Sequence, residues 1–107
     1  MTLGELQSLI RAMYHDKDAA RGVEGTFMWL VEEIGELSTA LREHAAGGGG
    51  EAAREALALE FADVLAWLAT IANVAGVDLE EAVRRKYGSG CPGCGRFACT
   101  CPDADKP

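Results

Sequence analysis

The chain has 107 residues, of which 49% are apolar and 25% are charged, and its formal net charge is -7. This length suffices for one domain with one modest core, and the acidic balance disfavours non-specific binding to a nucleic acid backbone. The first residues show no basic region followed by an apolar stretch, and no apolar run reaches the roughly 18 residues that span a bilayer. We therefore expect a cytoplasmic protein without a signal peptide and without a nucleic acid or membrane partner.

Apolar residues recur at helical spacing almost throughout the chain, and strand signals are nearly absent. Thr26 is expected to cap the second helix, whose start could also fall one turn earlier; Gly76 is expected to end the third helix, and Asp78 to cap the fourth. The segment 15–25 is polar and contains glycines, so we predict a loop there, and a second connection at the glycine run 47–50. The predicted helices cover residues 3–14, 26–45, 51–75 and 79–87.

Short connections between four helices predict an all-α, four-helix antiparallel bundle. We assign residues 1–88 to this helical domain and residues 89–107 to a Cys-rich tail.

Five carboxylates lie inside two strongly apolar predicted helices: Glu32, Glu33 and Glu36 in the second, and Glu60 and Asp63 in the third. The three-residue spacing places Glu33 with Glu36, and Glu60 with Asp63, on one face of each helix. Carboxylates in apolar surroundings are costly, and several that converge repel each other unless a cation lies between them. Oxygen ligands in this number suit Mg²⁺ or Mn²⁺, so we predict a divalent metal site between the two helices.

Two other interpretations of these acidic residues are weaker. A plain bundle with solvated acidic faces would favour Lys and Arg partners at i+4, whereas each carboxylate pair lies one turn from a tryptophan, Trp29 or Trp67. A di-iron carboxylate bundle needs Glu-x-x-His motifs, and no histidine follows Glu36 or Glu60 by three residues.

The motif E-E-x-x-E at residues 32–36, followed after 23 residues by E-x-x-D at residues 60–63, resembles the MazG-like nucleotide pyrophosphohydrolases of the all-α NTP pyrophosphatase superfamily. The segments W-L-V-E-E-I-G-E-L, E-F-A-D-V-L-A-W-L and G-V-D-L-E-E-A-V-R-R-K-Y are similar to members of this family, so the resemblance covers about residues 3–87. It implies Mg²⁺-dependent hydrolysis of a nucleoside triphosphate between the α and β phosphates, which gives a nucleoside monophosphate and pyrophosphate.

The same resemblance implies the metal ligands Glu33, Glu36, Glu60 and Asp63. Glu32 would be an accessory ligand or would orient the attacking water, so Glu32 and Glu33 are the candidate catalytic residues. Bound metal ions would neutralise the polyphosphate and lower the pKa of a water aligned for in-line attack. Which glutamate acts as the general base is left open.

Three further residues are candidates for substrate binding. Lys86 falls on the apolar face of the fourth predicted helix and could reach a phosphate, with snorkelling or a salt bridge as the alternative. Trp29 could stack on a nucleobase, and Asn73 could bond the base or the sugar, but each could equally serve the core or a neighbouring backbone group. The preferred base and sugar are not readable from the sequence.

The four cysteines of the tail follow the pattern C-x₂-C-x₄-C-x-C. Four thiolates close a tetrahedral site, so we predict a structural Zn²⁺ held by a zinc knuckle, with disulfides, free thiols and an iron–sulfur cluster as the alternatives. The MazG-like domain does not need this tail, so a rival interpretation is a catalytically weak bundle that binds a partner or regulates through its knuckle. The predicted zinc ligands are Cys91, Cys94, Cys99 and Cys101.

The MazG-like family assembles as dimers or tetramers, so the resemblance implies a homodimer or homotetramer. Few core aromatic residues and an alanine-rich third helix agree with burial of further surface by self-association. The alanines that could permit a close helix contact are Ala58, Ala62, Ala66 and Ala69.

Overall fold

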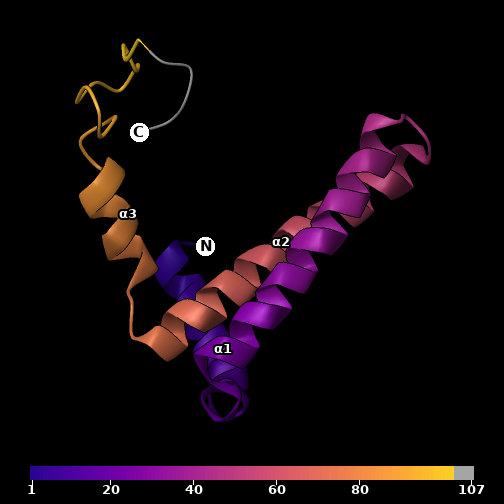
Figure 1. Ribbon diagram of the computed structural model, residues 1–107, viewed down its shortest axis with the longest axis horizontal. Coiled ribbons are helices and arrows are strands. Elements are labelled where there is room, and N and C mark those ends of the chain that lie inside the picture. Colours follow the sequence, from indigo (N-terminus) through magenta and orange to yellow (C-terminus); the bar gives the residue numbers. More distant parts are fainter. Residues whose placement is uncertain (103–107) are drawn as a thin grey trace.

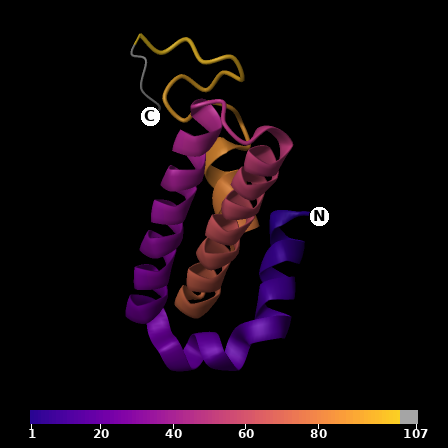
Figure 2. The ribbon, with the colours of Figure 1, turned by 90° about the vertical axis from the view of Figure 1, so that its right-hand side faces the viewer.

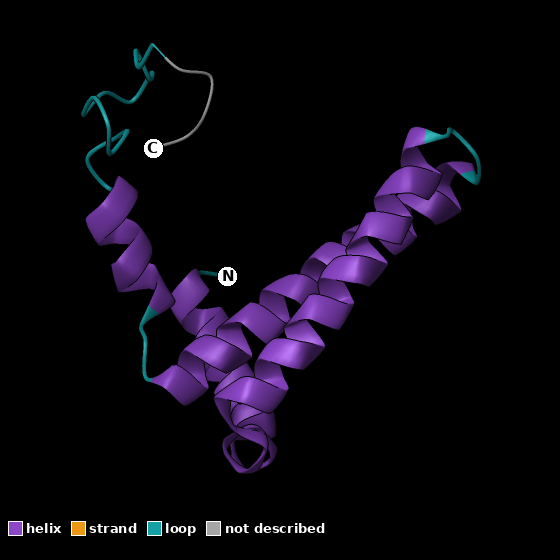
Figure 3. Cartoon of the chain, in the orientation of Figure 1, coloured by secondary structure: helices purple, strands orange, loops and turns teal. Residues whose placement is uncertain are grey.

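The computed structural model describes residues 1–102, which form three helices and no strand (Figure 1, Figure 3). Helix α1 spans Leu3–Ala45, α2 spans Gly50–Ala75 and α3 spans Leu79–Tyr87. The prediction of an all-α fold is confirmed. The predicted count of four helices is not, because the first two predicted helices belong to one long helix, α1.

Helix α1 is divided by a kink at Gly22, where the backbone takes φ 78° and ψ 178°. Only glycine adopts this conformation without strain, so Gly22 can interrupt the helix while the chain on both sides stays helical. We call residues 3–21 the first arm of α1 and residues 23–45 its second arm.

The predicted loop at 15–25 is wrong, since all of its residues except Gly22 are helical. Arg21 donates to Asp18 one turn earlier at 3.0 Å, which gives this polar segment helical i,i+3 support. The prediction that Thr26 caps a helix is also wrong. Its buried hydroxyl donates to the carbonyl of Gly22 at 2.7 Å. The interruption lies at Gly22, one turn earlier, which agrees with the alternative start that the sequence left open.

Three other helix ends follow capping chemistry that the sequence encodes. Thr2 and Glu5 form a capping box at the start of α1. Gly76 ends α2 with φ 73°, and the Asp78 side chain accepts from the backbone N–H of Glu81 at the start of α3, so the predicted ends at these two residues are confirmed.

The two arms of α1 run on either side of α2 (Figure 2), and the α1–α2 contact is the main packing interface among the described helices. Helix α3 turns away from α2 and returns to the first arm of α1 (Figure 1). Buried Gln7 makes this junction: its amide donates to the carbonyl of Val77 at 2.9 Å and accepts from the backbone N–H of Leu79 at 2.7 Å.

The core of this single chain is thin. Large apolar side chains on α1 and α2 remain more than half exposed, among them Phe27 (55%), Met28 (73%), Leu59 (56%) and Phe61 (53%). Exposed apolar surface of this extent marks an interaction face. The buried apolar residues of the described chain are Ile10, Leu30, Ala40, Ala69 and Ala72.

Helix α2 has an 18-residue window with a mean hydropathy of 1.5, of which 17% is buried in the fold. By length and composition alone it is therefore apolar enough to cross a membrane, although charged residues interrupt it and no continuous apolar run reaches about 18 residues. The expectation of no membrane partner stays a prediction. The same helix carries Glu60 and Asp63, and burying two carboxylates in a bilayer would be costly.

Candidate active site and thiolate cluster

Carboxylates from the second arm of α1 and from α2 converge where the two helices pack. One carboxylate oxygen from each of Glu33, Glu36 and Glu60 lies within 4.8 Å of the others. We call these three residues the acidic cluster. Glu33 and Glu36 share a face of α1 because they are three residues apart, and Glu60 faces them from α2.

Two oxygens of the acidic cluster are buried without a hydrogen-bond partner among the described residues, Oε2 of Glu33 and Oε2 of Glu60. Burial raises the pKa of both carboxyls, and the negative charges of Glu36 and Asp63 raise it further. No ion pair within residues 1–102 neutralises the acidic cluster. Unpaired, converging carboxylate oxygens are the donor set that a hard divalent cation fits.

The two remaining predicted acidic residues lie outside this group of three. Asp63 is exposed, yet it is close enough for its charge to raise the pKa of Glu33 and Glu60. Glu32 is exposed on the second arm of α1 and contributes no oxygen to the group.

The two tryptophans beside the carboxylates stack on each other. The ring centroids of Trp29 and Trp67 are 5.9 Å apart and their planes differ by 13°. The guanidinium carbon of Arg21 lies 4.9 Å from the centroid of the Trp67 ring, within the range of a cation–π contact. The face that Trp29 turns toward Trp67 is therefore occupied by that ring.

A cavity of about 370 Å³ opens between the first arm of α1 and α2. Asp63 belongs to its lining, so the cavity adjoins the acidic cluster. Apolar and aromatic side chains make up about half of the lining residues, and the polar ones include Asp18, which sequence reasoning missed because it assigned residues 15–25 to a loop. The lining residues are Ile10, Tyr14, Lys17, Asp18, Arg21, Asp63, Ala66, Trp67 and Thr70.

A larger open hollow of about 1020 Å³ lies between the start of α1 and α3, and none of its lining residues belongs to the acidic cluster. Asn73 lies there, and its side chain is engaged by α1: Oδ1 accepts from Gln7 at 3.1 Å and from Arg11 at 3.2 Å. Lys86 is exposed on α3, with its Nζ 5.4 Å from the Tyr87 ring centroid. Neither Asn73 nor Lys86 lines the cavity beside the acidic cluster.

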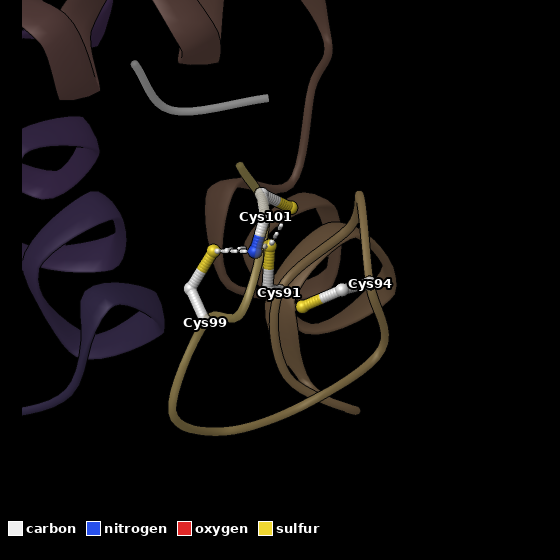
Figure 4. A group of neighbouring side chains, drawn as sticks. All are labelled: Cys91, Cys94, Cys99 and Cys101. Atoms are coloured by element: carbon white, nitrogen blue, oxygen red, sulfur yellow. Dashed lines mark hydrogen bonds between the residues drawn. The ribbon is translucent and has the colours of Figure 1, made fainter. Parts of the chain in front are cut away.

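The four cysteines gather in the tail (Figure 4), and their Sγ atoms all lie within 4.8 Å of one another. All four are free. The sulfurs of Cys91 and Cys99 are 3.5 Å apart and those of Cys91 and Cys101 are 3.8 Å apart, well beyond the length of a disulfide bond, about 2.05 Å. A tetrahedral Zn²⁺ site with Zn–S distances of about 2.3 Å separates its sulfurs by about 3.8 Å. The observed spacing therefore suits a tetrathiolate metal site.

Backbone amides of the tail favour thiolates. The backbone N–H of Thr100 donates to Sγ of Cys94 at 3.4 Å and, with that of Arg96, lowers the pKa of Cys94 to about 6. Neighbouring sulfurs, Cys99 first, raise the pKa of Cys101 to about 12. Without a cation, the crowded sulfurs therefore cannot all ionise near neutral pH, and a bound metal removes this conflict.

Comparison with known proteins agrees with the acidic motif. Residues 21–94 match the model of the MazG nucleotide pyrophosphohydrolase domain. The chain is also 39% identical over 85 residues to the dATP/dGTP diphosphohydrolase of Cyanophage S-2L, an alignment that covers 79% of this chain and 70% of that protein. The chain belongs to the MazG nucleotide pyrophosphohydrolase family, and it is an enzyme of the nucleoside triphosphate pyrophosphohydrolase class. The predicted family and the enzyme class are confirmed, which disfavours the rival interpretation of a catalytically weak bundle.

Proposed function

We propose that this enzyme hydrolyses a nucleoside triphosphate between the α and β phosphates in a Mg²⁺-dependent reaction, releasing a nucleoside monophosphate and pyrophosphate. The observation that carries the proposal is the acidic cluster with its two buried, unpartnered carboxylate oxygens. These oxygens have no cation among the described side chains, and a polyphosphate cannot approach them without one.

Glu33, Glu36, Glu60 and Asp63 would hold Mg²⁺ or Mn²⁺. When bound, the metal supplies charge neutralisation for the triphosphate and activation of a water nucleophile. Glu32, exposed beside the acidic cluster, is our candidate for orienting the attacking water, and Glu33 is the second candidate for proton transfer. Lys86 remains a candidate phosphate contact, whereas the hydrogen bonds of Asn73 favour a structural role for that residue.

Purine deoxynucleoside triphosphates are the first substrates to test, because the Cyanophage S-2L relative is named for dATP and dGTP. Pyrophosphate release from a nucleotide panel, with and without Mg²⁺, tests the proposal, and chromatography of the products tests the cleaved bond. We expect Glu36→Gln and Asp63→Asn to lower kcat/KM at least about 100-fold, since metal ligands are lost. The matched control is Glu43→Gln, an exposed glutamate further along the same helix, which should leave the rate unchanged.

Absence of turnover by the unmodified enzyme with every nucleotide would overturn the proposal. Formation of a nucleoside diphosphate and inorganic phosphate would overturn the cleavage position while leaving the enzyme class intact.

The tail is proposed to hold one structural Zn²⁺ through Cys91, Cys94, Cys99 and Cys101, supported by the sulfur separations and the N–H···S bonds around Cys94. Elemental analysis should find about one zinc per chain, and Co²⁺ substitution should give the charge-transfer bands of a tetrathiolate site. Cys94→Ser should lower the zinc content, whereas Asp63→Asn should lower Mg²⁺-dependent turnover and keep the zinc. Zinc that persists in Cys94→Ser and Cys101→Ser would contradict this assignment.

A homodimer or homotetramer is proposed from the exposed apolar side chains of α1 and α2. If copies of the chain bury that face against each other, the high hydropathy of α2 is explained by an interface between subunits, and the enzyme can be cytoplasmic. Light scattering that finds a monomer at micromolar concentration would contradict the proposed assembly.

A further inference from the structure

Asp18 is the buried carboxylate that the metal chemistry does not use. The residue is only 4% exposed, and the two oxygens of its side chain differ in their surroundings. Oδ1 accepts from Nη1 of Arg21 at 3.0 Å, whereas Oδ2 is buried and has no hydrogen-bond partner among the described residues. A buried acceptor without a donor costs free energy, so a ligand that supplies a donor would gain from meeting it.

The position of Asp18 relates this acceptor to the acidic cluster. Asp18 and Asp63 line the same cavity of about 370 Å³, and Asp63 is also close to Glu33 and Glu60. A nucleotide whose triphosphate lies at the acidic cluster therefore has this cavity beside it for its nucleoside part. The volume lies within the range of small-molecule sites, about 300–1,000 Å³.

The lining of the cavity favours a nucleobase. Ile10, Ala66 and Trp67 supply apolar surface, and the charged side chains of the lining are Lys17, Arg21, Asp63 and Asp18. Among the lining residues, Asp18 has the one buried side-chain acceptor without a partner. A nucleobase combines a flat apolar body with N–H donors on its edge, which matches this lining. An ionised phosphate has no donor for the free Oδ2, and Arg21, one of the two cations of the lining, is already engaged by Oδ1.

We propose that Asp18 is a specificity-determining residue, whose Oδ2 accepts a hydrogen bond from an N–H group on the Watson–Crick edge of a purine base held in this cavity. The inference rests on the proposed function, because it places the nucleotide by its triphosphate at the acidic cluster. In adenine the donor is the 6-amino group, and in guanine it is N1–H or the 2-amino group. Arg21 acts as a positioning residue, since its ion pair holds Oδ1 and leaves Oδ2 for the base.

The ion pair with Arg21 makes Asp18→Asn an informative substitution. Arg21 can only donate, so the amide oxygen of asparagine will take the place of Oδ1. The amide NH₂ then takes the place of Oδ2 and presents donors where the base also presents donors. The substitution reverses the polarity of the contact with little change in volume.

The experiment measures kcat and KM for dATP, dGTP and purine-2′-deoxyriboside triphosphate, which has no N–H on the Watson–Crick edge. For the unmodified enzyme we expect kcat/KM for dATP to exceed that for the donor-free analogue about 10- to 100-fold, mainly through KM, because a hydrogen bond to a charged group is lost. In Asp18→Asn the values for dATP and dGTP should fall to that of the analogue. Asp16→Asn is the matched control, since Asp16 is exposed, is absent from the cavity lining and should keep the preference.

Three results would overturn the inference: an unmodified enzyme that treats dATP and the analogue alike, an Asp18→Asn enzyme that keeps the preference, or an equal loss for all three substrates. Dideoxy-ATP distinguishes a contact to the base from a contact to the sugar, because it lacks the 3′-hydroxyl and keeps the base. If its kcat/KM falls to that of the donor-free analogue, the donor belongs to the sugar and the base contact is overturned.

Calorimetric binding of α,β-methylene dATP and of its donor-free analogue, in the presence of Mg²⁺, keeps the two proposals apart. If the unmodified enzyme binds nucleotides but releases no pyrophosphate, the proposed function fails while the affinity ratio still tests Asp18. If neither nucleotide binds, the base contact is overturned together with the proposed function.

Discussion

The indole rings of Trp29 and Trp67 stack with centroids 5.9 Å apart and join the second arm of α1 to α2. Trp29 precedes Glu33 by one turn, and Trp67 follows Asp63 by one turn. Because each ring is attached to the helix that carries part of the acidic cluster, the stacked pair sets how far the two helices can slide past each other. Packing of these rings therefore contributes to the alignment of the carboxylates.

Truncation of this pair should weaken the fold and the site together. Trp29→Ala is expected to lower the free energy of unfolding by about 1–3 kcal/mol, since a half-exposed ring loses its area and its aromatic contact. Circular dichroism should lose the exciton couplet of two stacked indoles, and Trp29→Phe should recover part of the stability. The control, Ser38→Ala on an exposed position of the same helix, should change stability by less than about 0.5 kcal/mol. An unchanged couplet in Trp29→Ala would show that the rings do not stack in solution.

The kink at Gly22 is the second feature that positions the site, because it turns the first arm of α1 toward the cavity that Asp18 lines. Gly22→Ala places a side chain at φ 78° and should lower the free energy of unfolding by about 1–2 kcal/mol, measured by urea denaturation. No atom lies within 4 Å of the added Cβ, so the cost comes from the backbone conformation. Gly48→Ala has equal space and no positive φ, so it should be nearly neutral. Equal stability of the two variants would contradict a rigid kink.

Side-chain periodicity and capping residues carried most of the fold prediction. Gly76 and Asp78 end and start helices as expected, because positive φ and side-chain capping are local properties of those residues. The segment 15–25 could not be predicted from composition. Besides the local Asp18–Arg21 pair, its helix is supported by the contact of Arg21 with the Trp67 ring of α2, which is a tertiary effect.

The candidate site, too, could be predicted only in part from the sequence. Spacing alone placed Glu33 with Glu36 on one helical face, and their meeting with Glu60 agrees with the predicted site between two helices. The role of Asp18 depends on burial, on one satisfied oxygen and on one free oxygen, and none of these has a signature in sequence spacing. For the same reason the engagement of Asn73 with Gln7 was visible only in three dimensions.

The acidic cluster should make the metal-free protein less stable as the pH rises. Burial and neighbouring charges raise the pKa of Glu33 and Glu60 above the ordinary value of 4.5 in the folded state. A carboxyl with a raised folded-state pKa binds more protons when folded, so its stabilising contribution is complete below the unfolded pKa and is lost as the pH rises through the folded pKa.

Glu36→Gln removes one of the repelling charges and tests this relationship. In Mg²⁺-free buffer at pH 7 its Tm should exceed that of the unmodified protein by a few degrees, and the difference should shrink toward pH 4.5, as the carboxyls become protonated. Addition of Mg²⁺ should reverse the order, because the unmodified protein gains binding energy that Glu36→Gln has lost. Thermal denaturation at the two pH values provides the measurement. A lower Tm for Glu36→Gln without Mg²⁺ would argue that Glu36 is a structural rather than a repelling group.

The thiolate cluster makes a prediction that is independent of turnover. In the zinc-free protein Cys94, with a pKa of about 6, is mostly thiolate at pH 7, whereas Cys101, with a pKa of about 12, is almost fully protonated. Iodoacetamide should therefore alkylate Cys94 before Cys101, and the rate at Cys94 should fall as the pH drops below about 6. Peptide mass spectrometry of briefly treated protein measures the order of modification.

Thr100→Pro removes the backbone N–H that bonds to Cys94, so it should raise the pKa of that thiol and slow its alkylation at pH 7. Equal rates at the two cysteines would contradict the assigned hydrogen bonds, and restored zinc should protect all four sulfurs.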